Sequence, residues 1–196
     1  MQSVASYTDL DAGPKTAVPW LVCMETQRLH FAPESGQVSP SFYVKVEACR
    51  RLLAHARQEH WRVIHVHRQR SETPSGRSDP ELRPIDGLAP LPTERVYVRY
   101  GSRSLGLAND PFWRDAATAC GARMIMVGHL SLQGIVEVSA TAAEAKVELA
   151  IVSDAVWRRA AEAPFADQSL PLVTLKRLRA MRPPGEDDRY SPANTG

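Results

Sequence analysis

Residues 123–155, RMIMVGHLSLQGIVEVSATAAEAKVELAIVSDA, decide the fold that this sequence predicts. Residues 124–127 form a short, unbroken apolar run, which is typical of a strand buried on both faces. The alanine-rich segment that follows favours a helix, and Gly134 stands where we expect that helix to begin. Residues 149–152 form a second buried strand, which Ser153 and the next residue should end. Strand, turn, helix and strand in this order predict a βαβ unit.

The rest of the chain continues this alternation of apolar runs and amphipathic segments. Further strands are predicted at 18–24, 62–67, 95–98 and 170–175, and further helices at 41–56, 110–121 and 157–163. Strands separated by helices favour an α/β fold, here a three-layer αβα sandwich around a mostly parallel sheet of about six strands. We assign residues 18–182 to this single domain, with a flexible arm at 1–17 and a disordered tail at 183–196.

Composition excludes several classes of protein. A chain of 196 residues with 43% hydrophobic content can bury one proper core. A formal charge of +2 is too small to indicate a nucleic-acid partner. The sequence has no signal-type apolar segment and no apolar run long enough for a membrane span. The chain has three cysteines, Cys23, Cys49 and Cys120, and they lack paired or metal-type spacing. This suits a reducing compartment, so we expect a soluble cytoplasmic protein.

Topology predicts where the chemistry lies. Ligands of open parallel sheets bind outside the carboxyl ends of the strands. The four turns that meet there are residues 25–27, 67–69, 99–102 and 129–134. The segment 69–93 is rich in Pro, Ser, Gly, Arg and Asp and is longer than a compact domain normally needs, which suggests an active-site loop or a partner surface.

Short motifs in these turns resemble those of the isochorismatase-like cysteine hydrolase family, over roughly residues 18–157. The family's first strand ends in Asp-x-Gln, where this chain has Glu25 and Gln27. A Lys follows the third strand of the family, and Arg99 is nearest to that position here. The first two motifs therefore keep their place in the chain but change their charged residues.

The turn that opens the central helix carries the third motif. The family has Gly-x-x-(Thr/Ser)-x-x-Cys there, and this chain keeps Gly128 and Ser131 but has Gly134 in the Cys position. A later strand ends in Asp-Ala in the family, as it does here at Asp154 and Ala155. The resemblance implies the family's hydrolase fold and self-association as a dimer or tetramer.

All three catalytic positions of the family are changed, which limits the chemistry that the resemblance implies. Gly134 cannot supply a thiolate, so an acyl-enzyme at this position is excluded. Glycine here also resembles the true isochorismatases, which protonate a vinyl ether and add water without a protein nucleophile. Glu25 would then be the general acid or base, with its pKa raised by a partly apolar crevice. Arg99 would hold an anionic group of the substrate.

Six further residues in or directly beside the turns are predicted to bind or position substrate: Gln27, His67, Arg103, His129, Leu130 and Ser131. His129 is also an acid–base candidate. Gly134 and its neighbours either form an oxyanion-type nest of backbone N–H groups or only permit close packing of helix and strand. His65 and His67 face the same side of a strand, but a third ligand is missing, so neither a metal nor a cofactor is expected.

These features leave a small set of functions open. The first is a hydrolase that acts on a small anionic molecule without a cysteine nucleophile. The alternative is an inactive member of the family that binds a ligand or serves as a structural subunit of a partner enzyme. The segment 69–93 and two tryptophans expected to be exposed, Trp113 and Trp157, motivate this alternative. A third hypothesis is an amidase with a side chain other than Cys as nucleophile.

Overall fold

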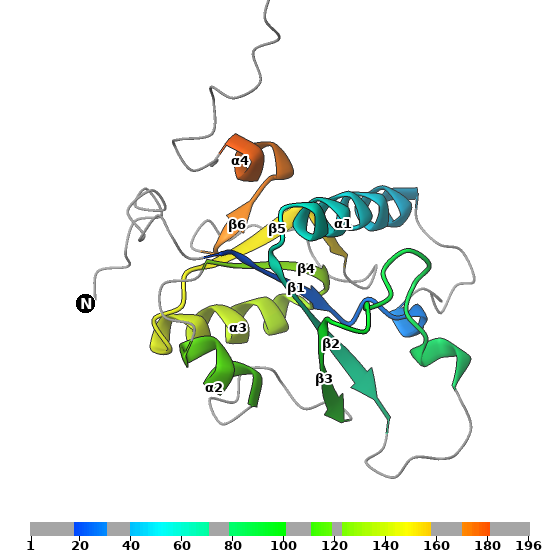
Figure 1. Ribbon diagram of the computed structural model, residues 1–196, viewed down its shortest axis with the longest axis horizontal. Coiled ribbons are helices and arrows are strands. Elements are labelled where there is room, and N and C mark those ends of the chain that lie inside the picture. Colours follow the sequence, from blue (N-terminus) through cyan, green and yellow to red (C-terminus); the bar gives the residue numbers. More distant parts are fainter. Residues whose placement is uncertain are drawn as a thin grey trace, which may run out of the picture.

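A single parallel sheet organises the molecule (Figure 1). The computed structural model describes residues 18–30, 40–70, 79–100, 111–118, 123–157 and 170–180. Within these residues six strands pair in the order β3-β2-β1-β4-β5-β6, and every pair is parallel. The strands are β1 (Trp20–Met24), β2 (Arg62–Gln69), β3 (Arg95–Tyr100), β4 (Met124–His129), β5 (Leu149–Trp157) and β6 (Leu172–Val173).

Helices cover both faces of this sheet. One face packs against α1 (Pro40–Gln58) and α4 (Leu175–Ala180), and the other against α2 (Pro111–Thr118) and α3 (Leu132–Glu144) (Figure 1). Two short 3-10 helices, η2 (Arg28–His30) and η3 (Pro80–Leu82), lie in the connections. The predicted three-layer αβα sandwich with a parallel sheet of about six strands is confirmed.

The central strands explain the unbroken apolar runs of the sequence. In β1, Leu21 and Cys23 pack into the core on the α1 side, while Val22 and Met24 pack into the core on the α3 side. All residues of β1 are buried, and neighbouring β4 is buried up to Gly128. A strand covered on both faces cannot alternate apolar with polar residues, so it reads as a continuous hydrophobic stretch.

Strand β5 is longer than the sequence predicted. Ser153 and the following Asp154 were expected to end it, and a helix was expected from Trp157, but the strand continues through Trp157. The two polar side chains have partners outside the strand: the Ser153 hydroxyl donates to the Val173 carbonyl at 3.2 Å, and the Asp154 carboxylate accepts from the Leu175 N–H at 2.9 Å. They therefore attach β6 and the start of α4 to β5 instead of ending it.

The last predicted strand is also shorter than expected. Only Leu172–Val173 of the segment 170–175 forms a strand, because α4 begins at Leu175. Several predictions fall outside the described residues: the arm 1–17, the tail 183–196, residues 158–163 of the helix predicted over 157–163, Cys120 and Arg103. Within the described part of the chain, no helix combines the length and the apolar character that crossing a membrane would require.

The two tryptophans expected to be exposed are buried, so that prediction is wrong. Trp113 and Trp157 each keep only 2% of their surface exposed. Trp157 packs edge-on against Phe42 of α1 with 5.4 Å between the ring centroids, and Trp113 packs in the same way against Phe112 at 5.1 Å. Both rings serve the core, and neither forms a surface for a partner.

Gly128 fixes how closely β4 approaches β1. Its φ of +109° is rarely adopted by residues with a side chain, and a Cβ at this position would lie 2.1 Å from the Met24 carbonyl oxygen. Met24 and Gly128 are register partners at the carboxyl ends of their strands, directly before the turn that follows β1. The close approach therefore positions that turn against β4.

We expect Gly128→Ala to lower the free energy of unfolding by about 3 kcal/mol or more, because both the backbone conformation and the contact with Met24 resist a side chain. Gly134→Ala is the matched control: among the described residues, its added Cβ would meet the Ser131 hydroxyl at 3.1 Å and the Leu130 side chain at 4.0 Å, and no backbone atom. Its unfolding free energy should stay within about 1 kcal/mol of the parent. Urea unfolding measures both, and equal losses would contradict this interpretation of Gly128.

Candidate active site

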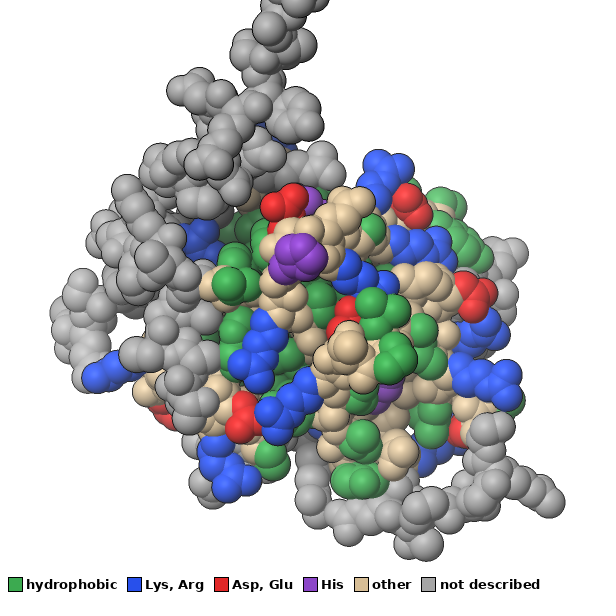
Figure 2. Space-filling view, in the orientation of Figure 1, with side chains coloured by type: hydrophobic (Ala, Val, Ile, Leu, Met, Phe, Trp, Pro, Cys, Tyr) green, Lys and Arg blue, Asp and Glu red, His purple; other side chains and the backbone are tan. Residues whose placement is uncertain are grey.

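The carboxyl ends of four neighbouring strands meet around a cavity of about 200 Å³. Each of the four predicted turns contributes at least one residue to its wall, together with the first turns of α3. On the face of the molecule seen in Figure 2, basic and acidic side chains are interspersed, in keeping with the small net charge. The cavity is lined by Met24, Glu25, Arg68, Arg99, His129, Leu130, Ser131, Gln133, Gly134, Glu137 and Val138.

Glu25 lies at the centre of the charged part of this cavity. The residue directly follows β1, is only 3% exposed and has a φ of +42°, which is unusual for a residue other than glycine. Its N–H donates to the Val66 carbonyl at 2.7 Å, which continues the pairing of β1 with β2. A backbone held in this region by its surroundings is a feature that clusters at functional sites.

Two arginines bind the Glu25 carboxylate. Arg99 Nη1 lies 3.0 Å from Oε1, and Arg68 Nε lies 3.4 Å from Oε2. His129 Nδ1 is 3.7 Å from the same Oε2. The crevice is partly apolar, as expected, with Met24, Leu130 and Val138 in its wall, but basic groups contact the carboxyl itself. Opposite charges at these distances favour the ionised carboxylate over the protonated acid.

The alternation of side chains along the strands determines which residues reach the cavity. Arg68 and Arg99 are register partners in β2 and β3, so both side chains lie on the same face of the sheet. Tyr97, two residues before Arg99, packs into the core on the α3 side. The arginines therefore face α3 and Glu25. Arg68 was not among the predicted site residues, although it stands in one of the predicted turns.

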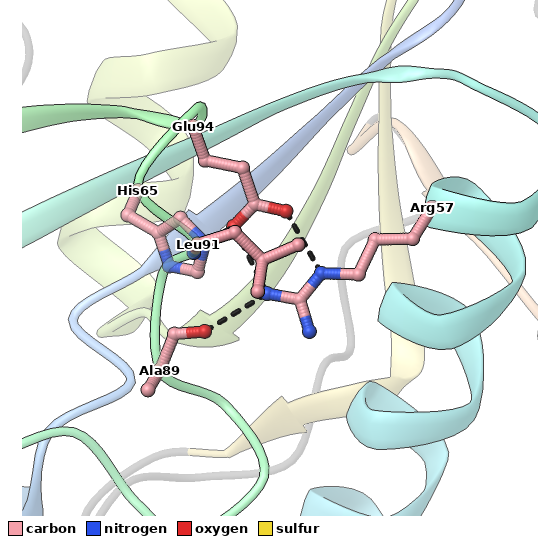
Figure 3. A network of polar contacts seen from close by, with 5 residues as sticks. All are labelled: Arg57, His65, Ala89, Leu91 and Glu94. Carbon is pink, nitrogen blue, oxygen red and sulfur yellow. Dashed lines mark hydrogen bonds and ion pairs between the residues drawn. The ribbon is translucent and has the colours of Figure 1, made fainter.

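His67 faces the other side of the sheet and does not line the cavity. It lies beside His65, with 5.8 Å between the ring centroids, and burial together with His65 lowers the pKa of His67 to about 4. His65 Nε2 is 2.9 Å from Glu94, which also binds the Arg57 guanidinium with both oxygens at 2.8 and 2.9 Å (Figure 3). This histidine pair belongs to the packing of β2 against α1 and the segment before β3.

The polar network around Glu94 is structural. Its carboxylate also accepts from the Leu91 N–H at 2.9 Å, and Arg57 donates to the Ala89 carbonyl at 2.8 Å (Figure 3). These contacts hold the turn before β3 against α1. In the described part of the chain, no three His, Cys, Asp or Glu side chains gather as metal ligands would.

Ser131 and Gly134 form the start of α3. The helix begins at Leu132, two residues before the predicted start, and the Ser131 hydroxyl caps it by accepting from the Gly134 N–H at 3.0 Å. That N–H is therefore not directed at a ligand, as a nest would require. A Cβ at Gly134 would have only Ser131 and Leu130 side-chain atoms within 4 Å among its described neighbours, so close helix–strand packing is not the reason for this glycine. Its effect is to leave the cavity open.

Gln27 acts on the backbone, and it lies outside the cavity wall. Its Nε2 donates to the carbonyls of Arg68 and Leu82 at 3.1 and 2.6 Å, and its Oε1 accepts from the Arg68 N–H at 2.6 Å. The side chain thus joins the end of β2 to η3, within the segment predicted as an active-site loop. Gln27 positions Arg68, which in turn binds Glu25.

The two described cysteines do not reach the cavity. Cys23 and Cys49 are completely buried in the core on the α1 side. A hydrogen bond with Cys49, together with burial, raises the pKa of Cys23 well above that of a usual thiol. Neither cysteine can therefore replace the nucleophile that position 134 lacks.

Comparison with solved structures identifies the architecture around this cavity. An isochorismatase family protein from Desulfovibrio vulgaris subsp. vulgaris str. Hildenborough matches with a TM-score of 0.59 at 20% identity, over 74% of this chain and 83% of that one. The fold is that of the isochorismatase-like hydrolases. An isochorismatase from Pseudomonas putida KT2440 matches with a TM-score of 0.54 at 23% identity, over 70% of each chain.

A third similar solved structure is described as an amidase. N-carbamoylsarcosine amidase from Thermoplasma acidophilum matches with a TM-score of 0.56 at 17% identity, over 78% of this chain and 88% of that one. No protein-family model matches the sequence, and a search of curated proteins gives no significant match. At these identities the likeness establishes the isochorismatase-like fold, while the activity has to be argued from the residues of the site.

We expect Gln27→Ala to lower the free energy of unfolding by about 2–4 kcal/mol, because it removes three hydrogen bonds and takes the side-chain partner from three part-buried backbone groups. Gln58→Ala, at the exposed end of α1, is the control and should change stability by less than about 0.5 kcal/mol. Chemical denaturation measures both variants. A Gln27 variant as stable as the control would contradict the positioning role.

The pKa of His67 predicts a pH dependence of stability. The pKa is about 4 in the folded chain and 6.5 for an ordinary histidine, so between these values the unfolded chain binds the proton and the folded chain does not. The free energy of unfolding should therefore decrease as the pH falls from 6.5 to 4. In His67→Asn this dependence on pH should become shallower, because unfolding would take up as much as one proton fewer. Denaturant titrations across this range measure it, with His60→Asn at an exposed turn as control. An unchanged slope in His67→Asn would contradict the assignment.

Proposed function

We propose that this chain is a hydrolase that acts on a small anionic molecule without a cysteine nucleophile, and that Glu25 is its general base. One observation carries the proposal: the buried carboxylate of Glu25, whose backbone is strained, binds two guanidinium groups. It does so in a cavity that also includes Gly134, which has no side chain, in the first turn of α3. Burying such charges is costly and seldom improves stability over an apolar core. Their position at the carboxyl ends of the strands supports a role in chemistry instead.

The arginines have a double role in this proposal. A guanidinium carries five N–H donors, so Arg99 and Arg68 can bind Glu25 and an anionic group of the substrate at the same time. The cavity of about 200 Å³ is smaller than the sites of drug-sized ligands, which supports a small substrate. The anion would be held next to the base, so that the reacting atom lies over Gly134.

Glu25 would act first as base and then as acid. The ionised carboxylate accepts a proton from a water as the water oxygen bonds to the substrate carbon, and the protonated carboxyl returns that proton to the leaving group. No covalent intermediate with the protein is formed. His129, whose Nδ1 is 3.7 Å from Glu25 Oε2, would orient the carboxylate through this cycle. The isochorismatase-like fold of known hydrolases supports the reaction class by analogy.

The test compares Glu25→Gln, Glu25→Asp and the exposed-site control Glu59→Gln on small esters and amides that carry a carboxylate, with products followed by NMR. We expect Glu25→Gln to lower kcat/KM by about 100-fold or more, Glu25→Asp to fall between, and the control to match the parent. Circular dichroism verifies that each variant is folded.

Equal turnover by Glu25→Gln and the parent would overturn the proposed mechanism. Binding of carboxylates without turnover of any member of the panel would favour the alternative function, an inactive binding subunit. The buried tryptophans no longer support that alternative, and the segment 69–93 is its remaining argument.

A further inference from the structure

A second cavity, of about 310 Å³, lies where α1 meets the described part of the segment 69–93. It is on the α1 side of the sheet, whereas the first turns of α3 line the candidate active site. The two cavities have no described wall residue in common, and the proposed function does not use the second one. Its described wall consists of Arg28, Tyr43, Val46, Arg50, Ile85 and Asp86.

The turn that follows η3 holds Arg50 at this cavity. Arg50 Nε donates to the Asp86 carbonyl at 2.8 Å, and the side chain lies against Gly87. Gly87 has a φ of +80°, and a Cβ there would lie 3.1 Å from Arg50 Nε. Arg50 Nη1 is 3.6 Å from Glu47, too far for a hydrogen bond, and the same carboxylate lies 3.0 Å from Arg51. The charge of Arg50 is therefore only weakly neutralised.

Arg28 brings a second guanidinium group to the cavity. Its Nη2 lies 2.7 Å from Asp86 Oδ1, and the two side chains are 48% and 84% exposed. Ion pairs with this much contact with water stabilise a protein little, so an incoming anion can share or replace the Asp86 carboxylate at small cost. A guanidinium has five N–H donors, and this ion pair uses one of them. Arg28 and Arg50 can therefore both donate to one anion.

The rest of the wall is apolar and aromatic. Val46 and Ile85 belong to the buried core on the α1 side and form the base of the cavity. Tyr43, which is 52% exposed, adds an aromatic ring to the wall. Aromatic rings prefer stacked or edge-on contacts with other rings, and guanidinium groups bind carboxylates with two parallel hydrogen bonds. The wall thus matches a molecule with a flat apolar body and an anionic end.

We propose that this cavity is a second ligand site of the chain and that it binds a small aromatic carboxylate. The carboxylate lies between Arg28 and Arg50, and the ring packs between Tyr43 and the apolar base. The volume of about 310 Å³ is at the lower end of the range for small-molecule sites, which suits a ligand with one ring. This inference goes beyond the proposed function and does not rest on it, because the two sites are on opposite faces of the sheet.

The experiment measures binding of phenylacetate, phenylacetamide and acetate to the isotope-labelled chain by NMR, at low ionic strength because salt screens exposed charges. Phenylacetamide lacks the charge, and acetate lacks the ring. The backbone amide signals of residues 43–50 and 85–88 report on the second cavity, so binding there is distinguished from binding at the candidate active site. We expect phenylacetate to bind about tenfold more tightly than either of the other two probes.

Two substitutions test the charged part of the site. Arg50→Gln should lower the affinity for phenylacetate about tenfold. Asp86→Asn should raise the affinity about twofold or more, because it removes the carboxylate that competes for Arg28 and keeps the carbonyl that holds Arg50. Arg114→Gln is the matched control, since it removes the same charge from an exposed position of α2 on the other face of the sheet, and it should bind as the parent does.

Two substitutions at Tyr43 test the aromatic part. Tyr43→Ala should bring the affinity for phenylacetate to within about threefold of that for acetate, because the ring of the ligand loses its partner. Tyr43→Phe keeps the ring and should retain the preference for phenylacetate. Circular dichroism verifies that all variants are folded, which we expect because every substituted side chain is at least partly exposed.

Equal binding of phenylacetate by Arg50→Gln and the parent would overturn the inference, as would a loss of affinity in Asp86→Asn. Binding of phenylacetamide as tight as that of phenylacetate, or binding of none of the three probes, would do the same. A response confined to amides around the candidate active site would also reject the second site. The test of Glu25 measures turnover, so failure of either proposal leaves the other standing.

Discussion

The buried charge of Glu25 is the constraint on which the arrangement of the site depends. A carboxylate that is only 3% exposed needs compensating charge, and the register of β2 with β3 supplies it by placing Arg68 beside Arg99 on one face of the sheet. Gln27 then holds the backbone of Arg68 in place through three hydrogen bonds. Backbone strain, ion pairs and a buried amide thus form one connected unit, and changing any of them disturbs the others.

Much of this architecture could be predicted from sequence, because apolar periodicity and strand order are local properties. The βαβ unit, the parallel sheet and the meeting of the turns around one cavity all follow from them. The side-chain directions in β2 could also have been predicted from the sequence. Neighbouring His67 and Arg68 must face opposite sides of the sheet, so only one of them can line the cavity with Arg99.

What could not be predicted depends on partners distant in sequence. Ser153 and Asp154 normally indicate the end of a strand, and only their contacts with β6 and α4 explain why β5 continues. Ser131 was a candidate for substrate binding, but capping α3 is the use that the structure shows for its hydroxyl. Trp113 and Trp157 are large side chains whose burial depends on the arrangement of whole helices and strands.

Gly134 has a consequence for how chemistry can change on this fold. The start of α3 has room for a side chain, its backbone is not strained, and the nearest obstacle is a hydroxyl that can rotate. A single substitution at position 134 could therefore convert a site with a protein nucleophile into one in which water attacks the substrate, or the reverse. The sheet would not have to change. The opposite holds at Gly128, where the two backbones meet too closely for any such exchange. The two glycines of this turn therefore differ in what they permit: a side chain can be added at position 134 but not at position 128.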